Sequence, residues 1–478
     1  MELERLVAAL APEAVLGSPD PVEVRDLAYE ARAVTPGAAF FAVPGERADG
    51  HDFAAQAVEN GAVALVVERA VEPEVPQLVV PSARAAMATA ADAFFGEPTR
   101  ELEVAGVTGT SGKTTTAYLL YSVLAAAGRQ PGLLGTVESR VGGEVRTVVR
   151  TTPEAIDLQR TFREMLDAGN QSVALEASSH ASVLHRLDRV RFDALVFTNL
   201  SQDHLDFHQS MDDYFAAKRK LFTGAAPVPA AVNIGDEWGR RLAEELAYAN
   251  RAPLITFGLA GDAEIRPAHL ELGATGARFT AGGIEIRSNL RGRFNVENVL
   301  GVIAAGILLD IDEDEIAAGI AALEGVPGRF EAVDEGQPFS VVVDYSHKPD
   351  ALDNVLRTAR ELTEGRVIVV FGAGGDRDRQ KRPLMGRVAR DLADVVIVTS
   401  DNPRSEDPLA IIQDVLQGSG TDVEIDPDRR SAIGRAIELA EKGDVVVIAG
   451  KGHEQGQEIA GEKLAFDDRV VAREALRT

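Results

Sequence analysis

The decapeptide VTGTSGKTTT, which begins at Val107, has the composition of a loop that binds phosphate. Gly109 and Gly112 let the backbone turn its N–H groups toward an anion. Lys113 adds a point charge, and Thr114 offers a hydroxyl group to Mg²⁺. The general pattern has a further glycine where this chain has Val107. The alternative is a tight strand-to-helix turn that contains a lysine. The loop predicts nucleotide binding but names no reaction.

Two regular elements must position this loop. The mostly apolar run from Leu102 to Thr108 predicts a buried parallel strand. The segment from Ala117 to Gly128 predicts a helix that closes with a glycine at its C-terminal end. The dipole at the start of that helix favours a bound anion. Strand, loop and helix together predict a phosphate cradle.

Two further polar clusters follow predicted strands. EASSH, Glu176 to His180, comes after Val173–Leu175, and NLSQDHLDFH, Asn199 to His208, comes after Ala194–Thr198. A carboxylate and imidazoles beside a phosphate loop can hold one or two Mg²⁺ ions, although Mg²⁺ prefers oxygen. Strand-end capping and core packing explain DHLDFH equally well. The basic triplet Lys218 to Lys220 indicates by itself only a solvated helix face.

The composition excludes several classes of protein. The chain has 478 residues, enough for three domains, and its hydrophobic content of 45% excludes disorder. A net charge of −26 argues against nucleic acid and anionic membranes, so local Lys, Arg and Mg²⁺ must meet an anionic substrate. The absence of cysteine excludes thiol chemistry and fits a cytoplasmic enzyme. We expect no signal peptide, and no membrane insertion because the longest apolar run, Val299 to Leu309, is too short.

The chain divides into three predicted α/β units. Residues 1–97 hold short strand candidates such as Ala39–Val43 and Ala62–Val67, and they end at a linker, Gly96-Glu97-Pro98. In residues 98–326 and 327–478, apolar runs alternate with helical segments, which predicts parallel sheets with ligands at the carboxyl ends of the strands. The strand candidates are Val173–Leu175, Ala194–Thr198, Ala230–Asn233 and Leu254–Phe257 in the second unit, and Ser340–Val343, Val367–Phe371, Asp394–Thr399 and Val445–Ala449 in the third.

In their order along the chain, the motifs resemble one family, the Mur ligases, which form amide bonds with ATP in peptidoglycan precursor synthesis. The motifs are TGTSGKTT, TTP, EASSH, FTNLSQDHLDFH, AAKRKLF, GRFNVEN, DYSHKPDAL, GAGGDRDRQKRPLMG, DNPR and GKGHE. The likeness extends from about Arg32 to Asp468 and is to the MurE type. It implies an N-terminal domain that binds a UDP-sugar, a central P-loop ATPase-like domain and a Rossmann-like C-terminal domain that binds an amino acid, in a monomer that closes around its substrates.

The resemblance also implies a chemistry at the phosphate loop. The family phosphorylates a carboxylate with ATP, and an amine then attacks the acyl phosphate. Lys113 would bind the β- and γ-phosphates, Thr114 and Glu176 one Mg²⁺, and His204 a second. Lys218 would be carbamylated by CO₂ to N6-carboxylysine, which replaces an ammonium with a carboxylate that supports Mg²⁺. The implied ATP-binding residues are Gly109, Thr110, Ser111, Gly112, Lys113, Thr114, Thr115, Asn298, Arg329, Asp344 and His347.

The implied UDP-sugar site joins the first unit to the second. Its residues are Ala31, Arg32, Glu46, Arg47, Ala48, Thr151, Thr152, Ser178 and Arg186. The chain departs from the family pattern at three positions. Ala31 replaces the serine of an Asp-Ser-Arg run, Leu184 replaces a frequent glutamine, and Lys348 replaces a common threonine. We expect Lys348 to alter the ATP contacts slightly and not the reaction.

The DNPR motif resembles the signature of members that add meso-diaminopimelate to UDP-N-acetylmuramoyl-L-alanyl-D-glutamate. Arg404 can meet the distal carboxylate of that amino acid with two charge-assisted hydrogen bonds, and Glu454 suits its distal ammonium. The implied amino-acid-binding residues are Arg377, Asp401, Asn402, Pro403, Arg404, Gly450 and Glu454. Three alternatives stay open: a surface ion pair of Arg404 with Glu406 or Asp407, a ligase that uses L-lysine or L-ornithine, and a non-catalytic protein that binds nucleotide as a switch.

Overall fold

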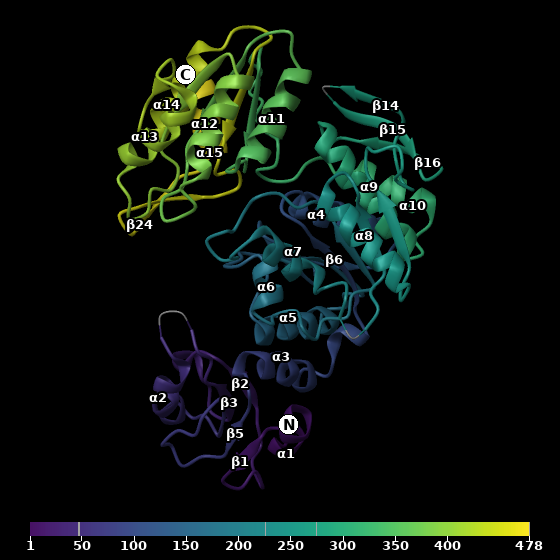
Figure 1. Ribbon diagram of the computed structural model, residues 1–478, viewed down its shortest axis with the longest axis vertical. Helices are drawn as coiled ribbons and strands as arrows, with labels where there is room; N and C mark the ends of the chain where they lie inside the picture. Colours follow the sequence, from purple (N-terminus) through teal and green to yellow (C-terminus); the bar gives the residue numbers. More distant parts are fainter. Residues whose placement is uncertain (46–47, 225, 274, 478) are drawn as a thin grey trace.

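The computed structural model describes residues 1–45, 48–224, 226–273 and 275–477. Three lobes follow one another in a curved row, and the two chain termini lie in the lobes at opposite ends (Figure 1). Glu46 and Arg47, two residues of the expected UDP-sugar site, lie outside the described part. Within the described part, no helix is long and apolar enough to cross a membrane.

The N-terminal lobe is a five-stranded sheet in the order β1-β5-β4-β3-β2, parallel except for β1. The predicted strands Ala39–Val43 and Ala62–Val67 correspond to β3 and β4. The elements of this lobe are α1 (Leu3–Leu10), β1 (Ala14–Leu16), β2 (Asp26–Ala28), β3 (Ala38–Phe41), α2 (Ala54–Glu59), β4 (Ala64–Val67), β5 (Gln77–Val79) and α3 (Ala83–Phe94).

The central lobe contains an eight-stranded sheet in the order β13-β12-β11-β6-β10-β7-β8-β9, in which only β8 and β9 run antiparallel to their neighbours. Its strands are β6 (Glu103–Thr108), β7 (Pro131–Leu134), β8 (Ser139–Val141), β9 (Glu144–Arg146), β10 (Ser172–Glu176), β11 (Ala194–Phe197), β12 (Ala230–Asn233) and β13 (Leu254–Phe257). Every strand that the sequence predicts for this unit is present. The interior strand β6 lies between β10 and β11, so the polar clusters that follow these three strands meet at one edge of the sheet.

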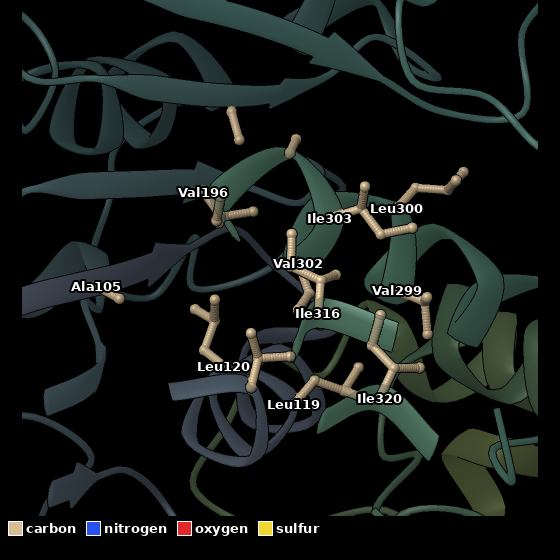
Figure 2. Close-up of a cluster of buried hydrophobic side chains, with 14 of the residues drawn as sticks. Ala105, Leu119, Leu120, Val196, Val299, Leu300, Val302, Ile303, Ile316 and Ile320 are labelled. Atoms are coloured by element: carbon tan, nitrogen blue, oxygen red, sulfur yellow. The ribbon is translucent and has the colours of Figure 1, made fainter. Parts of the chain in front are cut away.

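Helices cover both faces of this sheet, as alternating side chains require. One face packs on α4 (Lys113–Ala126) and α9 (Arg293–Leu308), and α10 (Glu313–Ala322) packs on α4; these elements share the buried cluster of Figure 2. The apolar run Val299 to Leu309 thus forms the second half of the mostly buried helix α9. The other face packs on α5 (Ala155–Asp167), α6 (Ser179–Val183), α7 (Met211–Arg219) and α8 (Glu237–Ala249).

A second, small sheet of the central lobe has no counterpart in the sequence prediction. Its antiparallel strands are β14 (Ala268–Gly273), β15 (Gly276–Ala281) and β16 (Ile284–Ser288). Burial in β16 alternates along the strand, and the apolar residues Ile284 and Ile286 pack into the same core as α9 and α10. This alternation is the signal that identifies an antiparallel sheet with one buried face.

The C-terminal lobe is a six-stranded sheet in the order β17-β18-β22-β19-β20-β21, parallel except for β17. The four predicted Val- and Ile-rich strands are β18, β19, β20 and β22, which confirms the doubly wound α/β fold. The elements are β17 (Glu331–Ala332), β18 (Ser340–Asp344), α11 (Pro349–Glu361), β19 (Val367–Phe371), α12 (Lys381–Leu392), β20 (Val395–Val398), α13 (Pro408–Ser419), β21 (Glu424–Ile425), α14 (Arg429–Leu439), β22 (Val445–Ala449), the hairpin β23 (Gly456–Ile459) and β24 (Glu462–Ala465), and α15 (Asp468–Leu476).

One buried ion pair fixes α14 to α15 in this lobe. The guanidinium of Arg429 donates two hydrogen bonds of 2.7 Å to the carboxylate of Asp468, and both side chains are fully buried. Arg429 also donates to the carbonyl oxygen of Ala449 at the end of β22. Removing one partner would leave the other charge buried and uncompensated.

We predict that Asp468→Asn lowers the free energy of unfolding of the C-terminal lobe by about 3–5 kcal/mol. The matched control is Glu474→Gln, because Glu474 pairs with Arg430 between the same two helices on the exposed surface. That change should cost about 1 kcal/mol or less. Hydrogen exchange of the backbone amides of β22, monitored at increasing denaturant, measures the free energy of unfolding of both variants. Equal effects of the two substitutions would contradict this account.

Candidate active site

A cavity of about 470 Å³ lies where the carboxyl ends of β6, β10 and β11 meet the C-terminal lobe. The register of the sheet explains this convergence, since Glu176 pairs with Val107 and Phe197 with Thr108. The residues that line it include the phosphate loop, Glu176, His204, Lys218, Arg329 and Lys348. The phosphate loop and the two polar clusters EASSH and NLSQDHLDFH therefore share one site.

The phosphate loop needs both of its glycines. Gly109 has a φ of +149° and Gly112 a φ of +85°, and side chains at these positions would collide with Thr198 and Asn298. The helix begins at Lys113, so the prediction of a helix starting at Ala117 is wrong by one turn. The early start directs the free N–H groups of the first helical turn at the loop, which is the geometry of an anion site.

Lys113 folds back onto its own loop. Its Nζ atom donates to the carbonyl oxygens of Gly109 at 3.0 Å and Thr110 at 2.9 Å. Burial, together with the positive charge of Lys348, lowers the pKa of Lys113 to about 8. The partners of this ammonium are thus backbone carbonyls.

Glu176 and Thr114 form an oxygen-rich pair beside the loop. The Glu176 carboxylate accepts hydrogen bonds from the Thr114 hydroxyl at 3.2 Å and from the backbone and hydroxyl of Thr136 at 2.7 and 3.1 Å. No group of three or more His, Asp or Glu among the described residues is arranged to hold a metal ion. One carboxylate and one hydroxyl nevertheless fit Mg²⁺, which keeps several waters and shares phosphate oxygens in nucleotide sites.

The structure divides the DHLDFH cluster between two roles. His204 lines the cavity with its Nε2 atom 3.0 Å from Asp203, and burial lowers its pKa to about 3, so the imidazole is neutral. A neutral imidazole is the form that binds metal. In contrast, Phe207 stacks on His180 and His208 contacts the Ser179 hydroxyl at 3.0 Å, which is packing.

Lys218 is not on a solvated helix face. It is 1% exposed, and its Nζ atom donates to the Gly109 carbonyl at 2.7 Å. Burial, with smaller effects from Lys113 and Lys348, lowers its pKa well below the usual value. The solvated-face interpretation is wrong for Lys218 and correct for its exposed neighbours, of which Arg219 pairs with Glu245 and Lys220 with Asp188.

The C-terminal lobe closes one side of the cavity. Arg329 donates to the Thr114 hydroxyl at 3.0 Å and stacks on the Tyr345 ring. Asp344 accepts from the Phe330 amide, and burial raises the pKa of its carboxyl group. The ring of His347 bonds to the Tyr345 carbonyl at 2.7 Å.

Asn298 and Lys348 complete this wall. The Asn298 side chain accepts from Thr116 and donates to Asn295, so it supports the phosphate loop from α9. Lys348 forms a 2.7 Å ion pair with Asp203, across the boundary between the lobes. The sequence predicted only a slight effect of Lys348 and gave no sign that Asp203 is its partner.

The expected UDP-sugar residues do not all lie together. Thr151, Thr152, Ser178 and Arg186 line the same cavity as the phosphate loop, as does Leu184. Thr152 donates to the Glu176 carbonyl at 2.7 Å, and Arg186 donates to the Thr152 carbonyl at 3.1 Å. The three described residues of the N-terminal lobe do not line this cavity: Ala31, Arg32 and Ala48.

The expected amino-acid residues form a second cluster after β20 and β22, outside the cavity. The Asn402 amide donates to Glu454 at 2.8 Å, and the buried ammonium of Lys451 bonds to both side chains. Gly450 approaches Asp401 so closely that a Cβ atom would lie 2.5 Å from its carboxylate. Pro403 continues the same loop. Lys451 was not among the predicted site residues, although it stands inside the GKGHE motif.

Arg404 pairs with a residue that the sequence analysis did not consider. Its guanidinium lies 3.3 Å from the carboxylate of Glu458 and donates to the Gly375 carbonyl at 2.6 Å. The proposed partner Glu406 pairs instead with Arg382, so the surface ion pair with Glu406 is wrong. Arg377 is exposed and bonds to the carbonyl of Asp376.

Three family models match the chain: "Mur ligase family, catalytic domain" over residues 23–95, "Mur ligase middle domain" over 107–306 and "Mur ligase, glutamate ligase domain" over 328–452. Together they cover most of the chain, including every loop of the cavity.

Similar proteins span the full length. A protein of Solibacter usitatus named UDP-N-acetylmuramoyl-L-alanyl-D-glutamate–2,6-diaminopimelate ligase is 48% identical, and the match covers 99% of this chain and 96% of that protein. A Streptomyces coelicolor protein of the same name is 47% identical over 98% of this chain and 96% of its own. A solved structure of a ligase of that name has a TM-score of 0.68 at 33% identity, with 95% of each chain covered. The chain therefore belongs to the Mur ligase family.

Proposed function

We propose that the chain joins meso-diaminopimelate to the D-glutamate γ-carboxylate of UDP-N-acetylmuramoyl-L-alanyl-D-glutamate, with ATP converted to ADP and phosphate. The observation that carries the proposal is one cavity in which the phosphate loop and Glu176 adjoin the expected sugar-nucleotide residues Thr151, Thr152 and Ser178. The shared name of the full-length relatives supports the same substrates. We place the reaction in the cytoplasm and in a monomer.

The chemistry has two balanced steps. In the first, an oxygen of the substrate carboxylate attacks the γ-phosphorus of ATP and forms a P–O bond. The bond between the γ-phosphorus and the β,γ-bridging oxygen breaks, and ADP leaves with its electrons. In the second, the amine of the incoming amino acid attacks the acyl carbon, phosphate leaves, and the nitrogen loses a proton. Both steps require positioning and charge stabilisation more than covalent help from the protein.

The chain supplies that stabilisation from the phosphate loop and the wall opposite it. The free N–H groups at the start of α4 and the ammonium of Lys113 would bind the β- and γ-phosphates. Ser111 and Thr115 lie in the same loop and first turn. Arg329 is poised at Thr114 to reach phosphate, while Asn298, Asp344 and His347 would frame the adenosine.

The donor set beside the loop fits Mg²⁺. Thr114 and Glu176 would hold one ion and His204 a second, with waters and phosphate oxygens as the other ligands. Bound Mg²⁺ neutralises the charge that develops on the transferring phosphoryl group. Glu176 is oriented for this role by Thr136, whose backbone and hydroxyl both donate to it.

Lys218 is proposed to react with CO₂ to give a carbamate. Its neutral amine attacks the carbon, the C–N bond forms, and one proton is released. Burial favours the reactive neutral amine because it lowers the pKa of the group. The carbamate nitrogen keeps one N–H, so it can retain the hydrogen bond to Gly109 that the structure shows. The product is an anion among the cations Lys113 and Lys348, and it supports Mg²⁺ where an ammonium would repel it.

The amino-acid end of the proposal rests on the second cluster. Arg404 would take the distal carboxylate of diaminopimelate, and Glu454 its distal ammonium, with Asp401, Asn402, Pro403, Gly450 and Arg377 around them. In the sugar-nucleotide site, Arg32 and Ala48 of the N-terminal lobe, together with Arg186, would contact the UDP-sugar. L-Lysine or L-ornithine is the alternative amino acid, and a nucleotide-binding switch is the alternative class.

We predict amide product and phosphate release with the UDP-linked dipeptide, ATP and meso-diaminopimelate, and much less with L-lysine or L-ornithine. Arg404→Met should lower kcat/KM for diaminopimelate by about 10- to 100-fold, the range for a lost charged hydrogen bond, and should change kcat/KM for lysine little. Phosphate release with each amino acid offered separately measures this. Release with lysine alone would overturn the role of Arg404, and no release with any amino acid would refute the ligase.

We predict that Lys218→Ala lowers kcat by about 100-fold or more, as removal of one electrostatic stabiliser does. The matched control is Lys220→Ala, because Lys220 lies two residues further along the same segment but pairs at the surface with Asp188. Rigorous CO₂ removal should reproduce the Lys218→Ala defect, and bicarbonate should reverse it. A ¹³C signal for the carbamate in ¹³CO₂ is an independent readout. Normal turnover of Lys218→Ala, or full activity without CO₂, would exclude the carbamate.

A further inference from the structure

Lys348 belongs to the C-terminal lobe, but its side chain reaches the central lobe. It stands at the N-cap of α11, immediately before Pro349, and is only 7% exposed. Its Nζ atom lies 2.7 Å from a carboxylate oxygen of Asp203 and 3.5 Å from the carbonyl oxygen of Thr110 in the phosphate loop. The ammonium group of Lys348 is thus placed over the loop by a different lobe.

Three ammonium groups share two carbonyl oxygens at this point. Lys113 donates to Gly109 and Thr110, Lys218 donates to Gly109, and Lys348 reaches Thr110. Like charges this close repel each other strongly in a buried cavity. Backbone carbonyls compensate them only in part. A polyanion in the cavity would give all three groups full partners.

Contacts other than the pair of Lys348 with Asp203 also join the lobes. At the same boundary, Ser201 donates to Asp350 at 2.5 Å, and Arg293 pairs with Glu361 at 3.3 Å. A buried ion pair is a weak source of stability, because desolvation offsets its Coulombic gain. Unlike these two contacts, Lys348 lies above the phosphate loop.

We propose that Lys348 binds the γ-phosphate of ATP, exchanging the carboxylate of Asp203 for phosphate oxygens. The inference rests on the proposed ligase function and adds a residue to its ATP site. The flexible four-carbon stem of lysine permits this exchange, and a third cation spreads the neutralisation of charge over the oxygens of the transferring group. The C-terminal lobe thereby supplies part of the phosphate site, so the site is complete only when this lobe is docked.

The test compares the affinities of Lys348 variants for a non-hydrolysable ATP analogue and for ADP by titration calorimetry. Lys348→Met should lower the affinity for the ATP analogue by about 10- to 100-fold, the range for a lost hydrogen bond to a charged group. ADP lacks the γ-phosphate, so its affinity should change less than about threefold, which also shows that the variant is folded. Lys348→Arg keeps the charge and should restore most of the lost affinity.

Ser201→Ala is the matched control, because it removes a contact between the same lobes that does not involve phosphate. It should affect the two nucleotides equally. If Lys348→Met lost affinity equally for the analogue and for ADP, or lost affinity for neither, Lys348 would be only a boundary contact and the inference would be overturned. Failure of the proposed function would be distinguished from this outcome by a different result: the unaltered protein would form no amide product, whatever its affinities for the two nucleotides.

Discussion

The structure depends on one electrostatic constraint: several cations face one cavity in a protein whose net charge is −26. Lys113, Lys218, Lys348 and Arg329 all face a cavity whose lining also includes the carboxylates of Glu176, Asp203, Glu297 and Asp344. Their mutual repulsion in a desolvated site is costly, and a bound nucleotide polyphosphate would remove it. The positive charge is local, so the acidic surface does not prevent binding of an anionic substrate.

The sheet topology creates this concentration of charge. Because β6 lies between β10 and β11, the carboxyl ends of these strands and the segments that follow them bring Lys113, Glu176 and His204 to one edge. Helix α7 adds Lys218 from the same lobe, and the C-terminal lobe adds Arg329 and Lys348. A ligand site at the carboxyl ends of parallel strands, near a change in strand order, is the general expectation for such sheets. Residues of two lobes therefore line the same cavity.

The sequence predicted the parallel strands and the cavity wall well, since both depend on local signals. Apolar runs such as Ala230–Asn233 and Val367–Phe371 have the same bounds in the structure. The loops that follow β6, β10 and β11 contain many of the residues that line the cavity. The resemblance to a family corrected the interpretation of Lys218, because a basic triplet gives no local sign that one of its members is buried.

The features that were missed depend on contacts between distant residues. The pairing of Lys348 with Asp203 joins positions 145 residues apart in different lobes, and no spacing rule predicts it. Likewise, β23 brings Glu458 to Arg404, and Glu458 then takes the place that the sequence analysis gave to Glu406. The small sheet of β14 to β16 was missed for a different reason, because its alternation of buried and exposed residues was present but not used.

The central claim is that the cavity transfers the γ-phosphate of ATP to a carboxylate oxygen. It is tested most directly with UDP-linked dipeptide labelled with ¹⁸O in the D-glutamate γ-carboxylate, incubated with ATP, Mg²⁺ and meso-diaminopimelate. The account predicts that each amide bond formed leaves one labelled oxygen in inorganic phosphate, as mass spectrometry would detect. Label found in AMP, or phosphate released without label while amide product forms, would contradict it.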